Sequence, residues 1–102
     1  MITLALFARL EARPGKEADV EKFLQAGLAM ANDEPTTPIW FALRTSPRSY
    51  AIFDAFQDES GRQRHLTGPI ADALKARWHD LFVGELKIEP IEVLGLKNKA
   101  AA

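Results

Sequence analysis

The sequence contains no cysteine. Disulfide bonds, thiolate nucleophiles and cysteine-ligated iron–sulfur clusters are therefore excluded, and a reducing compartment such as the cytoplasm is the expected location. Histidine is also scarce, with only His65 and His79. Helical periodicity places His79 on the solvent side of its helix, away from His65, so no metal site is predicted.

An excess of positive charge is absent as well. The chain has 13 Lys and Arg against 14 Asp and Glu, a formal net charge of -1. Affinity for nucleic acid depends largely on clustered positive charge, so a nucleic-acid partner is not expected. The segment 1–6 has no basic residue, and Arg9 follows it closely. This start predicts neither a signal peptide nor a membrane span.

Apolar residues are plentiful, and their spacing indicates one small domain. The chain has 102 residues, of which 47% are hydrophobic. Alternating apolar patterns predict strands near 2–12, 39–45, 50–56 and 86–96. Helical spacing predicts a helix over 16–32 and a second helical region over 58–84, interrupted at Gly68-Pro69. This β-α-β-β-α-β order predicts a ferredoxin-like α+β domain over 1–96 with a four-stranded antiparallel sheet, followed by a frayed tail over 97–102.

The second and third predicted strands, 39–45 and 50–56, are expected to form a hairpin through the turn 46–49, where Pro47 sets the bend. With a four-residue turn, Phe41 pairs opposite Asp54 and Trp40 pairs opposite Ala55. One face of the hairpin then carries Ile39, Phe41, Leu43, Tyr50, Ile52, Asp54 and Phe56. The other face carries Trp40, Ala42, Arg44, Ala51, Phe53 and Ala55.

Both of these faces are mostly apolar, and this predicts a homodimer. Two helical segments can cover only one face of a four-stranded sheet, and monomers rarely expose a large apolar patch. We therefore expect the other face to pack against a second copy of the chain. The predicted dimer interface consists of Trp40, Ala42, Arg44 and Phe53, although Arg44 could simply edge the sheet.

Several short motifs resemble those of a known family. A strand leads through Pro14-Gly15-Lys16-Glu17 into a helix, and a later strand ends in Asp54-Ala55-Phe56 before the acidic turn Gln57-Asp58-Glu59-Ser60. His65-Leu66 follows, with Pro69 soon after. In these features the chain resembles the antibiotic-biosynthesis-monooxygenase, or quinol-monooxygenase-like, family of dimeric α/β barrels. The resemblance implies a ligand pocket between the sheet and the helices of each protomer.

The resemblance also implies an activity. Some members of that family oxygenate electron-rich phenols or quinols with dioxygen and no cofactor, so the first hypothesis is a cofactor-independent monooxygenase acting on a small aromatic or quinol. Two departures weaken this hypothesis: Phe56 replaces the usual Trp, and Ile52 stands where polyketide-oxygenating members have Asn. The loss of the polar position at Ile52 favours an alternative. The first strand also lacks the Asn of the haem-degrading members. The alternative is a non-catalytic dimer that binds a small apolar molecule, and a third class with the same element order is an RNA-binding module.

His65 and Asp54 are the candidate catalytic residues. The ring of His65 titrates near neutral pH and could accept a phenolic proton. Its structural alternative is a hydrogen bond near the Gly68-Pro69 break. A carboxylate in mid-strand, such as Asp54, is costly unless it is paired, and burial would make it a better base. Its alternative is an ion pair with Arg62 or Arg64.

An aromatic and apolar stripe could form the floor of the pocket. Large aromatic residues more often belong to the core, and this is the competing interpretation. The predicted ligand-binding residues are Phe41, Tyr50, Ile52, Phe56 and Trp78.

Overall fold

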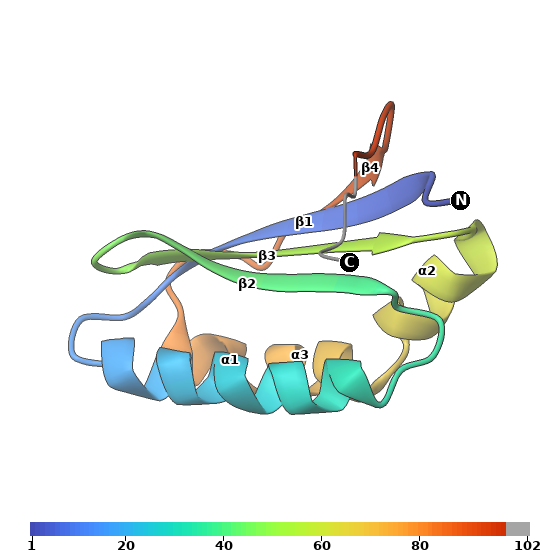
Figure 1. Ribbon diagram of the computed structural model, residues 1–102. Coiled ribbons are helices and arrows are strands. Elements are labelled where there is room, and N and C mark those ends of the chain that lie inside the picture. Colours follow the sequence, from blue (N-terminus) through green and yellow to red (C-terminus); the bar gives the residue numbers. More distant parts are fainter. Residues whose placement is uncertain (98–102) are drawn as a thin grey trace, which may run out of the picture.

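The computed structural model describes residues 1–97 (Figure 1). The chain has the predicted ferredoxin-like α+β fold. The elements are β1 (Leu4–Glu11), α1 (Glu17–Asn32), β2 (Ile39–Ser46), β3 (Ser49–Phe56), α2 (Glu59–Leu66), α3 (Pro69–Leu81) and β4 (Ile88–Glu92).

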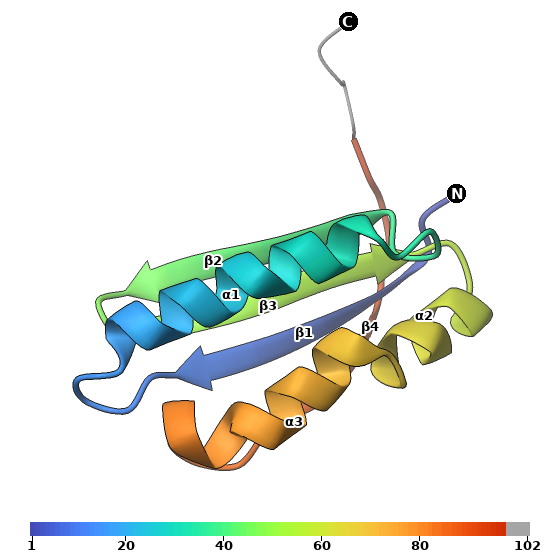
Figure 2. The ribbon, with the colours of Figure 1, turned by 90° about the horizontal axis from the view of Figure 1, so that it is seen from below.

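The strands form one antiparallel sheet in the order β2-β3-β1-β4. All helices of residues 1–97 lie on one side of this sheet, and none of them covers the other side, called the uncovered face below (Figure 1). Seen from the helix side, α1 runs along β2 and β3 while α3 runs along β1 (Figure 2). The hydrophobic core fills the space between these two layers, and its fully buried members include Leu10, Val20, Leu81 and Phe82.

The helix boundaries follow from local signals in the sequence. Glu17 and Asp19 lie in the first turn of α1, where they suit the positive end of the helix dipole. Asp58 caps α2 by accepting a hydrogen bond from the backbone N–H of Gly61 at 2.8 Å. Pro69 occupies the first turn of α3 and separates it from α2, as the sequence predicted.

The register of the β2–β3 hairpin differs from the predicted one. Ser46 pairs with Ser49 around the two-residue turn, but Arg44 pairs with Tyr50, so Thr45 is an extra residue on β2. Such a bulge shifts the register by one residue. Two local hydrogen bonds accompany it, from Thr45 Oγ1 to the carbonyl of Ser49 at 3.2 Å and from Arg44 Nη2 to the carbonyl of Pro47 at 3.0 Å.

Because side chains alternate along a strand, this shift moves every side chain of β2 to the other face. The predicted faces of β2 are therefore wrong. Trp40, Ala42 and Arg44 lie on the helix side and not on the uncovered face, and Phe41 lies on the uncovered face and not beside Asp54. The indole of Trp40 packs on α1 at Gly27, where an added Cβ would lie 3.2 Å from the ring.

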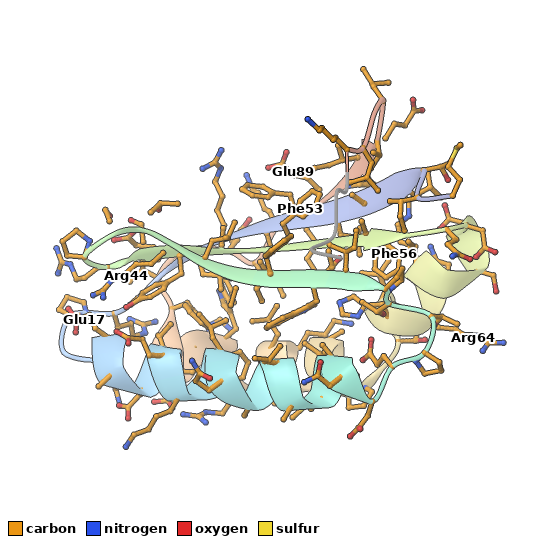
Figure 3. All side chains as sticks on the ribbon, in the orientation of Figure 1. Glu17, Arg44, Phe53, Phe56, Arg64 and Glu89 are labelled. Atoms are coloured by element: carbon orange, nitrogen blue, oxygen red, sulfur yellow. The ribbon has the colours of Figure 1, made fainter. Side chains whose placement is uncertain are left out.

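The uncovered face carries a row of aromatic side chains. Phe7 of β1, Phe53 of β3 and Phe41 of β2 are direct neighbours in the sheet register. Phe53 lies on this face as predicted, pointing away from the helices (Figure 3). The rings of Phe41 and Phe53 are 6.4 Å apart, and Phe41 is 54% exposed.

The C-terminal part differs from the predicted strand over 86–96. Regular pairing covers only Ile88–Glu92, and beyond it the N–H of Val93 donates to the carbonyl of Thr3. Leu94 is then 96% exposed. The predicted frayed tail falls outside the described residues except for Lys97. Within residues 1–97, none of the helices has the length and apolar character needed to cross a bilayer.

Candidate functional site: a buried histidine between two carboxylates

His65 and Asp54, the two predicted catalytic residues, are brought together under the helices. The His65 Nε2 atom lies 3.0 Å from Asp54 Oδ2. On the other side of the ring, Nδ1 lies 2.8 Å from Glu34 Oε1. His65 is 6% exposed and Asp54 is 3% exposed. The site is thus one imidazole held between two carboxylates and largely shielded from bulk solvent.

Three separate elements supply this cluster. Asp54 comes from the helix-facing side of β3, His65 from the last turn of α2, and Glu34 from the connection between α1 and β2. Close packing holds the connection against α2, since a Cβ on Gly61 would lie only 2.9 Å from the backbone oxygen of Thr36. The hydroxyl of Thr37 donates to Glu34 Oε1 at 2.8 Å and fixes that carboxylate in place.

Burial and mutual hydrogen bonding change the proton affinities of the pair. Burial raises the pKa of the Asp54 carboxyl above its usual 3.8, and the hydrogen bond with His65 offsets part of that effect. Burial alone would lower the pKa of His65. Its hydrogen bonds to Asp54 and Glu34 and their negative charges outweigh burial, so the pKa of His65 is raised above its usual 6.5.

A small cavity of about 30 Å³ adjoins the cluster. Asp54 and His65 are its polar lining, and the rest of the lining is aliphatic. Leu66 and Ile88 are the half-buried members, so the cavity approaches the surface between α2 and β4. The aliphatic lining residues are Leu6, Ala8, Ile52, Leu66, Ile70, Ala71, Leu74 and Ile88.

The other predicted ligand-binding residues are placed unevenly around this cavity. Ile52 lines it, and the Phe56 ring packs 5.4 Å from the His65 ring. Tyr50 and Trp78 line a different hollow of about 350 Å³ near the β2–β3 turn. Trp78 donates its Nε1–H to the carbonyl of Gly84 at 2.8 Å and packs against Phe82, so it belongs to the core.

The structural alternative considered for Asp54, an ion pair with Arg62 or Arg64, is not what the structure shows. Arg62 binds Glu59 and the carbonyl of Ala5, and Arg64 points outward into solvent (Figure 3). Neither arginine pairs with Asp54, whose partner is His65.

Glu34 was missed by sequence reasoning. It sits in a segment with two prolines, which is typical of a surface loop, and nothing in its spacing connects it to His65. Its contact with His65 follows from the tertiary packing of this connection against α2.

We expect the free energy of unfolding to decrease as the pH rises above about 6.5. His65 has a raised pKa, so its contribution to stability is complete below 6.5 and is lost as the pH passes through its folded-state pKa. The raised pKa of Asp54 has the same effect on stability. Its contribution is complete below pH 3.8 and is lost as the pH passes through its folded-state pKa.

The measurement is chemical denaturation at several values of pH between about 6 and 9. This range avoids acid, where Glu59 and Asp80 act in the opposite direction because Arg62 and Arg77 lower their pKa values. His65→Gln should flatten the profile, while the control His79→Gln, at the exposed histidine, should keep it. A profile that is flat in the wild type would contradict this account of the cluster.

Comparison with known proteins gives a close relative among solved structures. A protein of unknown function from Nitrosomonas europaea, NE2512, is 48% identical, with a TM-score of 0.92 over 99% of this chain and 98% of that one. The chain belongs to the same family as NE2512. No family model matches the sequence, and no curated protein matches it significantly.

More distant structures share the fold. A “Putative antibiotic biosynthesis monooxygenase” from Nitrosomonas europaea has a TM-score of 0.80 at 11% identity, over 90% of this chain and 99% of that one. A protein with the same description from Caulobacter crescentus has a TM-score of 0.78 at 19% identity, over 91% of each chain. The resemblance to antibiotic-biosynthesis-monooxygenase-like proteins is thus confirmed, and at these identities it concerns the fold.

Proposed function

We propose that the protein is a cofactor-independent monooxygenase acting on a small aromatic or quinol substrate. The observation that carries the proposal is the Asp54–His65 pair at the inner wall of an aliphatic cavity. A buried carboxylate with a raised pKa is a suitable base for a weakly acidic phenol. The aliphatic lining suits an apolar substrate and dioxygen.

The proposed reaction begins with transfer of a phenolic proton to the Asp54–His65 pair. The electron-rich anion then reacts with dioxygen at a ring carbon, and the peroxide formed takes back a proton. Cleavage of its O–O bond leaves one oxygen atom on the ring and releases the other as water. For a quinol the balance is quinol plus dioxygen to hydroxyquinone plus water, and the substrate supplies all the electrons.

The size of the cavity bears on substrate entry. At about 30 Å³ it has room for water or dioxygen, but pockets that enclose organic ligands measure roughly 300–1,000 Å³. An aromatic ring therefore requires movement of the half-buried side chains of Leu66 and Ile88 at the surface end of the cavity. Asp54 would then contact the substrate hydroxyl from the sheet side of the cavity.

The test uses 1,4-naphthoquinol with no added flavin or metal. We expect the protein in air to form the hydroxynaphthoquinone, and to form none without dioxygen. Uncatalysed oxidation in air yields the plain quinone and hydrogen peroxide, so product analysis separates the two reactions. Plain quinone alone, at the rate of a protein-free control, would count against the proposal.

One observation favours the alternative of a non-catalytic binding protein. Ile52 gives the cavity an aliphatic wall where polyketide-oxygenating relatives place an amide. A small apolar molecule retained at one per protomer through purification, without turnover in air, would support this alternative.

We also propose that the uncovered sheet face packs against a second copy of the chain. Phe41 is 54% exposed and Leu43 is 39% exposed on this face, and monomers rarely expose large apolar side chains side by side. The same face carries Arg9 and Glu89, so two copies related by a twofold axis could pair opposite charges. A second copy thus suits the face better than a nucleic acid, which would meet Glu89.

A further inference from the structure

Glu34 touches the site without lining the cavity. Its carboxylate binds His65 Nδ1 at 2.8 Å, on the side of the ring opposite Asp54. Its side chain is only 15% exposed, and the Thr37 hydroxyl holds it from behind. Its Oε2 atom is buried without a hydrogen-bond partner among residues 1–97. Burying part of a carboxylate in this way is costly, so its place beside the ring requires an explanation.

We propose that Glu34 is a positioning residue that keeps the Nδ1 proton on His65, so that Asp54 and Nε2 share a single proton and act together as one base. Where catalysis is concerned, this inference rests on the proposed function.

The positions of the two carboxylates beside the ring nitrogens of His65 support this role. An acceptor at Nδ1 stabilises the tautomer that carries its hydrogen there. Nε2 then faces Asp54 Oδ2 across 3.0 Å, a distance that one shared proton satisfies. Asp54 Oδ1 is buried and has no hydrogen-bond partner among the described residues. It remains available to accept a proton from a molecule in the cavity.

The charged groups in contact with the His65 ring support the same role for Glu34. The carboxylates of Asp54 on β3 and Glu34 on the α1–β2 connection are the charged groups in contact with it. The Phe56 ring packs beside it and brings no charge. Removing the negative charge of Glu34 therefore removes one of the two groups that favour the imidazolium form.

The experiment measures the ring nitrogens of His65 by long-range ¹H–¹⁵N NMR across a pH titration, with His79→Gln used to assign the two histidines. In the wild type we expect Nδ1 to carry a proton at every pH studied. In Glu34→Gln the amide oxygen can still accept from Nδ1 but the charge is gone, so the pKa of His65 should fall by about 1–2 units. The matched control Asp33→Asn, in the same connection, should leave it unchanged.

The wild-type spectrum tests the role of Glu34 even if Glu34→Gln folds poorly. An unprotonated Nδ1 in neutral His65 would overturn the proposal, as would an unchanged pKa in folded Glu34→Gln. Where quinol turnover is observed, its pH profile should shift with the pKa of His65. A protein that shows the NMR result but no turnover would retain the role of Glu34 while refuting the monooxygenase.

Discussion

Asp54→Asn should reduce the rate of quinol oxygenation by about 10²–10⁴-fold, the usual contribution of a positioned general base. Asparagine keeps the shape of the side chain and can still hydrogen-bond to His65, but its amide does not accept a proton. Asp54 is 3% exposed, so bulk water has little access to its position. The loss should therefore appear in the chemical step.

The measurement is kcat/KM for the quinol at fixed dioxygen, with circular dichroism to confirm the fold. Asp80→Asn is the matched control, because Asp80 is an exposed carboxylate on α3 far from the cavity. It should keep the wild-type rate. A folded Asp54→Asn protein with undiminished turnover would show that another group is the base.

Phe41→Glu should convert the proposed dimer to a monomer. Phe41 ends the aromatic row on the uncovered face, next to Phe53. A glutamate there would place a carboxylate in the apolar contact between two copies, with its image on the other copy close by, and a buried unpaired charge is strongly unfavourable. Since Phe41 is exposed in the protomer, the fold itself should survive the change.

Light scattering coupled to size-exclusion chromatography measures this directly against the 11.3 kDa mass of one chain. The wild type should have about twice that mass, and the variant about that mass. Leu28→Glu is the control, because Leu28 on α1 is 42% exposed on the helix side of the molecule. A monomeric wild type, or a dimeric Phe41→Glu protein, would contradict the proposed interface.

The order of the elements was largely predictable because apolar periodicity marks α1, α3 and the strands of the hairpin, whereas α2 has almost no apolar stripe. The helix break at Pro69 is an equally local signal, and the structure confirms it. The cap at Asp58 is local as well. Asp54 and His65 were predicted separately, from a carboxylate in an apolar strand and a histidine on the following helix. Their contact follows because α2 packs back over the end of β3.

The faces of β2 were not predictable in the same way. The turn residues determine the first pair of the hairpin, and Ser46 does pair with Ser49. The bulge at Thr45 then depends on packing, because it directs Trp40 onto Gly27 of α1. A rule that counts residues from the turn contains no information about that tertiary contact.

The most direct test of the proposed chemistry is oxygenation of 1,4-naphthoquinol under ¹⁸O₂, with the product quenched after the first turnovers. The mechanism predicts one labelled oxygen atom in the hydroxynaphthoquinone, one dioxygen consumed for each product molecule, and no hydrogen peroxide. Unlabelled product, or hydrogen peroxide formed in equal amount to plain quinone, would contradict oxygen transfer at the Asp54–His65 site.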